Sequence, residues 1–188
     1  NYKYLYIFQI QLNFKEIIIP SFVKIIKPYA LRDCQSLTQL IIPSSVTSIE
    51  KFAFANCSSL KSLLIPSSVV EIDTCVFDQC TSLKQITFEK HSLLKIIKKS
   101  VFNKCSSLTQ ISIPSSVIEI QEFAFCECSS LKEITFEIPS SLEKIRNSAF
   151  CQCSSLEKVM IPSSANIEPS PFLECPKATL IPININII

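Results

Sequence analysis

The chain has 188 residues, and 47% of them are hydrophobic, which is enough for the interior of one domain or one array of repeats. Only 18% are charged and the net charge is +2, with both signs mixed along the chain, so we expect no nucleic-acid partner. Glycine is absent. The usual phosphate-binding loops, dinucleotide motifs and nucleophile elbows need glycine and are therefore excluded. Turns must avoid positive φ or place Asn, Asp or strained residues there.

Residues 1–13 are predicted to form an N-terminal strand or cap. Aromatic and aliphatic side chains alternate from Tyr2 to Phe14, which is typical of a strand. The stretch is too short and too polar for a transmembrane helix, so we expect no membrane insertion in this segment. It also lacks the basic start and continuous apolar centre of a signal peptide, although a processed product would lack them too.

A repeat occupies residues 14–175. Its clearest marker is a cysteine that recurs every 22 to 25 residues, at Cys34, Cys57, Cys80, Cys105, Cys128, Cys153 and Cys175. Leu, Ile, Val, Pro and Phe recur at fixed offsets from it, which gives the consensus C-S-S-L-x-x-I-x-I-P-S-S-V-x-x-I-x-x-x-A-F-x-x. Such a period predicts a solenoid. We expect about seven units, at residues 14–34, 35–57, 58–80, 81–105, 106–128, 129–153 and 154–175, followed at 176–188 by a worn cap or a truncated repeat.

Each part of the consensus predicts a piece of one turn. The L-x-x-I-x-I segment reads as a strand, and stacked turns would pair these strands in parallel. Pro ends the strand, and the Ser-Ser pair offers hydroxyls to the backbone of the corner. V-x-x-I predicts a second short extended segment, and A-F-x-x-C a tight helical or 3₁₀ piece. The burial of about six apolar side chains per unit does not offset the conformational entropy lost when 23 residues are ordered. A single unit is therefore unstable, and only a stacked array is stable.

Two units are longer than the others. The segments "FEKHSLL" and "FEIPSSL", after Cys80 and Cys128, each carry two extra residues near the corner. We therefore expect two small bulges on one edge of the solenoid.

The motif L-x-x-I-x-I-P-x-x-V-x-x-I-x-x-x-A-F-x-x-C resembles the BspA-type leucine-rich repeat over about residues 14–175. The stretch "LTQISIPSSVIEIQEFAFCEC" (108–128) is close to that family's consensus. Two departures stand out: the family's Gly after the second Ile is replaced, and Ser occupies the position of the Asn that forms a buried ladder in commoner leucine-rich repeats. The resemblance implies a mainly β leucine-rich-repeat solenoid in a surface or secreted protein of adhesion or protein-binding function. Its partner would be a protein, from a host or the same cell.

The candidate binding surface is the outward side of the L-x-x-I-x-I strands, since alternate residues of a strand face away from the core. Two columns of side chains would form it. They are Gln39, Ser62, Gln85, Gln110, Glu133 and Lys158 at the third position, and Ile41, Leu64, Thr87, Ser112, Thr135 and Met160 at the fifth. This surface is polar, nearly uncharged, and apolar at both ends. It suits a protein better than a phosphate, or it is merely a solvated sheet.

The seven cysteines that mark the repeat, which we call the column cysteines, would form a line along the solenoid rather than a tetrahedron. We therefore interpret them as small buried apolar residues and expect no metal site. Cys126 and Cys151 each lie two residues before a column cysteine in adjacent units. They would lie side by side within disulfide range. Two free thiols, a disulfide, and a metal clip shared with Cys128 and Cys153 all remain open.

We expect no catalytic site and no cofactor. His91 is the single histidine, and without a nearby nucleophile it builds no catalytic triad. Asn56-Cys57-Ser58 fits the glycosylation sequon, but the predicted burial of Cys57 argues against modification.

The sequence therefore predicts a non-enzymatic protein-interaction module of adhesion or surface-antigen type, at the cell surface or secreted. An intracellular, cytoplasmic scaffold is the alternative, because the cysteine-rich interior is compatible with a reducing compartment. Imperfectly capped ends would also permit end-to-end self-association.

Overall fold

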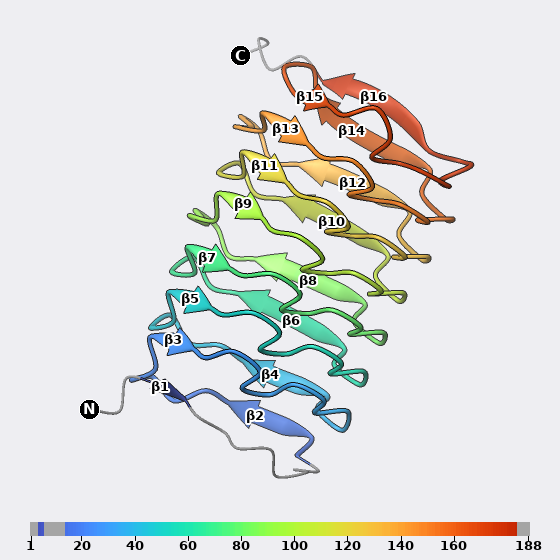
Figure 1. Ribbon diagram of the computed structural model, residues 1–188. Coiled ribbons are helices and arrows are strands. Elements are labelled where there is room, and N and C mark those ends of the chain that lie inside the picture. The colour runs from blue at the N-terminus through green and yellow to red at the C-terminus, as the bar shows by residue number, and fades with distance from the viewer. Residues whose placement is uncertain (1–3, 6–13, 184–188) are drawn as a thin grey trace.

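The computed structural model describes residues 4–5 and 14–183 of the chain. The chain winds into a β-solenoid of about seven stacked turns, with the two termini at opposite ends (Figure 1). The predicted solenoid is therefore confirmed. Of the N-terminal strand predicted at residues 1–13, the described part is β1 (Tyr4–Leu5), and the rest lies outside the described residues. The exact boundaries of the seven units remain predictions.

The long strands of the solenoid come from the L-x-x-I-x-I segments and lie side by side. We call them the main sheet. They are β2 (Glu16–Ile18), β4 (Gln39–Ile41), β6 (Ser62–Ile65), β8 (Gln85–Phe88), β10 (Gln110–Ile113), β12 (Glu133–Phe136), β14 (Lys158–Pro162) and β16 (Thr179–Ile183). Pairing is parallel within β2–β4, β6–β8 and β10–β12–β14–β16, and paired residues face their counterparts in the next unit, as Ile111 faces Ile134. β4 contacts β6 and β8 contacts β10, so the three groups follow one another along the solenoid. Alternation of buried and exposed residues along these strands places one side in the core.

The V-x-x-I segments form a second series of strands, each of two residues. These are β3 (Ile25–Ile26), β5 (Ser48–Ile49), β7 (Glu71–Ile72), β9 (Ile96–Ile97), β11 (Glu119–Ile120), β13 (Lys144–Ile145) and β15 (Asn166–Ile167), with β1 paired to β3. They also pair in parallel and in register with the repeat. The predicted second extended segment is thus confirmed.

The A-F-x-x-C segments are turns, so the prediction of a helical or 3₁₀ piece is wrong within the described residues. Two residues in each of the first six turns explain this, because they adopt positive φ and interrupt any helix; in the second unit they are Phe52 (56°) and Asn56 (59°). The amide between them donates to the next turn instead, as Phe54 N does to Val76 O at 3.0 Å. The backbone is therefore satisfied by lateral bonds between turns.

The core is one continuous column of repeated apolar side chains. Its centre is a stack of phenylalanines whose neighbouring ring centroids are 5.1 to 5.5 Å apart, formed by Phe54, Phe77, Phe102, Phe125, Phe150 and Phe172. The first five are fully buried. Stacked rings at this spacing add to the stabilisation from burial, so each turn is held by the turns on both sides.

Serine hydroxyls and cysteine thiols form two ladders in place of the missing asparagine ladder. Ser45, Ser68 and Ser116 donate through Oγ to the backbone carbonyls of the preceding unit at 2.7 to 2.8 Å. Cys80 Sγ donates to Phe54 O at 3.4 Å, and the other column cysteines from Cys57 to Cys175 repeat this contact. The Ser-Ser phrase therefore satisfies the corner backbone, as the sequence predicted.

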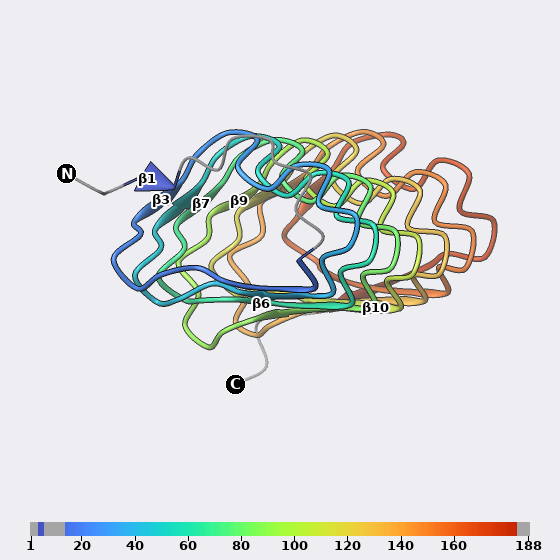
Figure 2. The ribbon, with the colours of Figure 1, turned by 90° about the horizontal axis from the view of Figure 1, so that it is seen from below.

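The two longer units protrude from one side of the solenoid. Figure 2 shows two loops, in green and orange, that extend beyond the otherwise uniform outline of the turns. The first lies between β8 and β9 and contains His91, and the second lies between β12 and β13 and contains the cis peptide bond of Ile138–Pro139. These positions are those expected for the two insertions.

The last described strand is more exposed than its counterparts. β16 pairs with β14 like any other repeat strand, so residues 179–183 continue the repeat. Leu180 occupies the column of Val159, yet it is 47% exposed whereas Val159 is fully buried.

Candidate interaction surface

All twelve side chains predicted for the binding surface lie on the outward side of the main sheet. The inward neighbours along each strand, such as Leu63 and Ile111, are at most 2% exposed, so the alternation leaves the predicted residues pointing away from the core. Gln110 faces Glu133 and Ser112 faces Thr135 across β10 and β12, and Leu64 faces Thr87 across β6 and β8. The structure thus brings the predicted residues together in two parallel columns.

Both columns are longer than predicted. Glu16 and Ile18 of β2 face Gln39 and Ile41, and Ile181 of β16 faces Met160. Phe14-x-x-Ile17-x-Ile19-Pro20 does match the strand motif, so the first extension could have been found from the sequence. The second could not, because the last unit is shortened between Cys175 and its strand.

The surface changes character along the solenoid axis. Ile18, Ile41 and Leu64 expose aliphatic side chains at one end. The middle carries amides and hydroxyls, with Gln85 Nε2 donating to Thr87 Oγ1 at 3.4 Å. An array of this kind can make many separate van der Waals and hydrogen-bond contacts with a second macromolecule.

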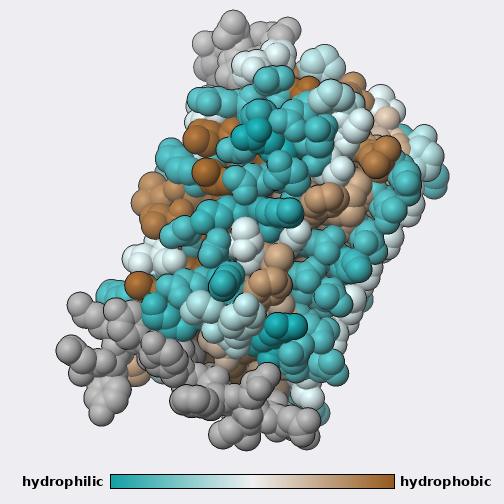
Figure 3. All heavy atoms as spheres, in the orientation of Figure 1, coloured by the Kyte–Doolittle hydropathy of each residue, from teal (hydrophilic) through white to brown (hydrophobic). Residues whose placement is uncertain are grey.

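The side of the molecule seen in Figure 1 is mostly hydrophilic, with hydrophobic residues in separate groups (Figure 3). Much of its polar surface is engaged in contacts between turns. Lys98 Nζ lies 2.6 Å from a Glu71 oxygen and 3.3 Å from an Asp73 oxygen, and Arg146 pairs with Glu168 at 3.2 Å. Several of these residues occupy the position of the family's glycine. They form ion pairs with neighbouring turns.

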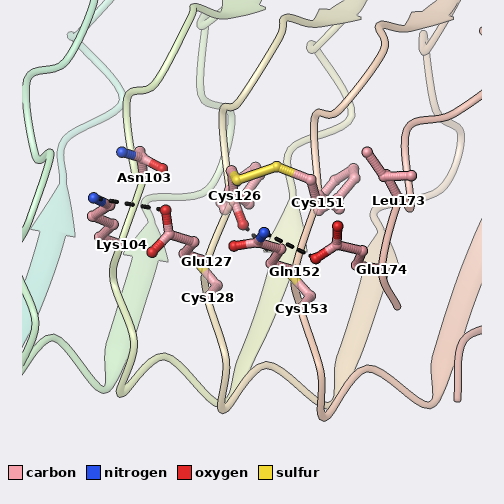
Figure 4. The surroundings of a disulfide bond; sticks show 12 residues. Asn103, Lys104, Cys126, Glu127, Cys128, Cys151, Gln152, Cys153, Leu173 and Glu174 are labelled. Carbon is pink, nitrogen blue, oxygen red and sulfur yellow. Dashed lines mark hydrogen bonds and ion pairs between the residues drawn. A yellow bond between two sulfur atoms is a disulfide. The ribbon is translucent and has the colours of Figure 1, made fainter. Parts of the chain in front are cut away.

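Cys126 and Cys151 are joined by a disulfide that links two adjacent turns (Figure 4). Their Cα atoms are 4.5 Å apart, and both residues are buried, at 6% and 5% exposure. The column residues Cys128 and Cys153 remain free thiols. A shallow depression of about 390 Å³ lies over the bond and is lined by Phe123, Leu173 and several polar side chains.

The described part of the chain holds no group of three or more His, Cys, Asp or Glu residues arranged to bind a metal ion. The column thiols lie in an apolar interior, and burial raises the pKa of Cys80 to about 12. Burial also raises the pKa of Cys57 and of Cys105. These thiols stay protonated at neutral pH and act as weak hydrogen-bond donors.

Asn56 and His91 lie in turns rather than in a shared site. Asn56 is half-buried, and its Nδ2 donates to Asp33 Oδ1 at 2.9 Å, while the following Cys57 is fully buried. His91 is exposed on the first insertion loop. Glycosylation of Asn56 would replace its bond to Asp33.

The stacked turns, the parallel main sheet and the repeat of about 23 residues define a leucine-rich-repeat solenoid. A model of the BspA type leucine rich repeat region (6 copies) matches residues 4–96 and 95–188, so the chain belongs to this family. The resemblance seen in the sequence is thereby confirmed. No curated protein matches the sequence.

Solved structures of bacterial leucine-rich-repeat proteins are similar to this chain. A leucine-rich repeat protein from Eubacterium ventriosum is 28% identical with a TM-score of 0.79, over 85% of this chain and 42% of that one. A leucine rich repeat protein from T. pallidum is 28% identical with a TM-score of 0.73, over 83% of this chain and 72% of that one. The pneumococcal vaccine antigen PcpA shares the fold at 22% identity and a TM-score of 0.55, over 81% of this chain and 52% of that one. This chain therefore spans less than half of the Eubacterium protein.

Proposed function

We propose that the chain is a non-enzymatic protein-interaction module that binds a protein partner through the outward side of its main sheet. The carrying observation is that two columns of outward side chains run in register across the strands of a rigid, laterally bonded backbone. Such a surface is pre-organised, so little conformational entropy is lost when a partner binds. The resemblance to the BspA-type family implies a protein-binding role, and this supports a protein as the ligand.

The proposal places the module at the cell surface or outside the cell, in an adhesion or surface-antigen role. The Cys126–Cys151 disulfide supports this placement, because such bonds persist mainly in oxidising compartments. Among the described residues, no helix is long and apolar enough to cross a membrane. The second candidate is a cytoplasmic scaffold with the same binding surface, which the eight free cysteines favour.

The proposed surface is tested with two matched double variants. Gln85→Glu with Gln110→Glu places negative charges on the main sheet, and Thr47→Glu with Val70→Glu places the same charges beside β5 and β7, where both residues are exposed. Each protein is immobilised and used to select from a phage-displayed library of protein fragments. Fragments selected by the wild type should be retained by the control variant and lost by the main-sheet variant. Equal retention by both variants, or loss on the control alone, would contradict the proposal.

A further inference from the structure

The outward side of the main sheet is apolar at its N-terminal end. Ile18, Ile41 and Leu64 occupy one column and are 62%, 40% and 52% exposed. Ile18 faces Ile41 in register, and β4 lies beside β6, so the three side chains form a continuous strip, which we call the aliphatic strip. The same column holds hydroxyls further along, at Thr87, Ser112 and Thr135, and becomes apolar again at Met160 and at Ile181, which is 38% exposed. The N-terminal end exposes more aliphatic side chain, so apolar burial by a partner would be largest there.

A row of lysines borders the aliphatic strip. Lys15, Lys61 and Lys84 each directly precede a main-sheet strand and are exposed. None of the three forms an ion pair with another described residue. We call them the lysine row.

The nearby acids do not neutralise the lysine row. Glu16 is the one carboxylate within β2, β4, β6 and β8. Glu89, at the corner after β8, accepts hydrogen bonds from Ser67 N and Ser67 Oγ at 2.8 and 2.9 Å. These bonds lower the pKa of Glu89 and hold its carboxylate at the corner.

The C-terminal half of the main sheet differs in charge as well as in polarity. There the lysines Lys132 and Lys158 are matched by Glu133 and Glu157. The excess of positive charge is thus confined to the same half as the aliphatic strip, in a chain whose net charge is only +2.

We propose that the aliphatic strip and the lysine row bind an acidic segment of a protein partner that carries apolar side chains between its carboxylates. The inference rests on the proposed function and specifies the chemistry of its partner. Apolar side chains would cover the strip while carboxylates meet the unpaired lysines, which combines area burial with charge complementarity. A nucleic-acid backbone offers phosphates but nothing to cover three exposed aliphatic side chains.

The test uses three fluorescent synthetic peptides of about twelve residues, long enough to cross the apolar half of the sheet. One alternates Leu with Glu, one Leu with Lys, and one Ser with Glu. Anisotropy titrations should show that the Leu/Glu peptide binds at least about tenfold more tightly than either other peptide. Its affinity should also fall in about 0.5 M NaCl, because salt screens the lysine row.

Two matched double variants locate the binding. Ile41→Ser with Leu64→Ser should weaken binding of the Leu/Glu peptide at least about tenfold, and Lys61→Gln with Lys84→Gln should remove the difference between the Leu/Glu and Leu/Lys peptides. The control, Thr47→Ala with Val70→Ser beside β5 and β7, lies outside the main sheet and should leave the affinity unchanged. All these side chains point outward, so unchanged circular dichroism verifies the fold.

Equal binding of the Leu/Lys peptide, or equal weakening by the control variant, would overturn the assignment. So would failure of the Leu/Glu peptide to bind at about 1 mM. The phage selection described above separates the two proposals: main-sheet-dependent fragments without acidic character would leave the proposed function standing and overturn only the chemistry of the partner.

Discussion

At the scale of single residues, left-handed backbone conformations occur at residue types that rarely adopt them. Fourteen described residues have positive φ, and none is glycine; they include Phe52, Lys104 and Gln152. Each conformation of this kind has an energetic cost, which the lateral hydrogen bonds between turns offset only in the stacked array. The turn conformation therefore depends on neighbouring units and was not predictable from the residue types.

The disulfide is a single covalent link between two turns, and its contribution can be measured. It closes a loop of 25 residues, so reduction should lower the free energy of unfolding by about 3 kcal/mol. Urea unfolding of the wild type with and without a phosphine reductant measures this difference.

The control for this prediction is Cys126→Ala with Cys151→Ala, whose stability should not respond to the reductant. If the reductant destabilised the wild type and this variant equally, a different cysteine pair would be responsible for the effect.

At the scale of elements, the phenylalanine stack should show the dependence of each turn on its neighbours. Phe102 is fully buried between two rings, so Phe102→Ala should cost about 3–5 kcal/mol in unfolding free energy. Phe172 is partly buried and, among the described residues, stacks on the Phe150 ring alone, so Phe172→Ala should cost less than about 2 kcal/mol. Denaturant unfolding compares the two, and equal costs would contradict a stack that ends at the last turn.

The thiol ladder should make stability fall at alkaline pH. Burial raises the pKa of Cys80 to about 12, whereas an exposed thiol titrates near 9.0, so above that pH the unfolded chain loses protons that the folded chain keeps. A raised pKa in the folded state therefore stabilises below pH 9, and the stabilisation declines as pH rises. Each such thiol contributes a decline of about 1.4 kcal/mol per pH unit.

Thermal unfolding between about pH 8 and 10 tests this slope. Cys105→Ala should reduce it by the share of one thiol, because burial also raises the pKa of Cys105. A slope that is identical in the variant and the wild type would show that lysines or tyrosines, rather than the ladder, set the alkaline limit.

The repeat made most of the elements predictable. The positions of Leu63, Ile111 and Phe102 follow from columns that recur in every unit, and one period places them all in the core. The hydrogen-bond partners within the two ladders were harder to predict. The acceptor of Ser68, for example, is a backbone carbonyl of the preceding turn that no local motif specifies. The bonding of Cys126 was left open for a similar reason, since spacing fixes the separation of the two cysteines but not their side-chain directions.

At the scale of the whole molecule, burial along the core predicts a gradient of stability. Leu180 is 47% exposed, whereas its counterparts from Leu40 to Val159 are buried, so less apolar contact stabilises β16 than the strands before it. Hydrogen exchange should therefore be at least about tenfold faster for the amides of β16 than for those of β10. Uniform protection of the two strands would contradict this expectation.

The central claim is that this leucine-rich-repeat solenoid acts as a binding module outside the reducing interior of the cell. The most direct measurement is a thiol map of the protein isolated from the cells that make it, by alkylation, digestion and mass spectrometry without reduction. We expect a disulfide-linked pair of peptides containing Cys126 and Cys151, with the eight other cysteines alkylated after unfolding. Ten alkylated cysteines would contradict the placement at the cell surface and favour the cytoplasmic scaffold.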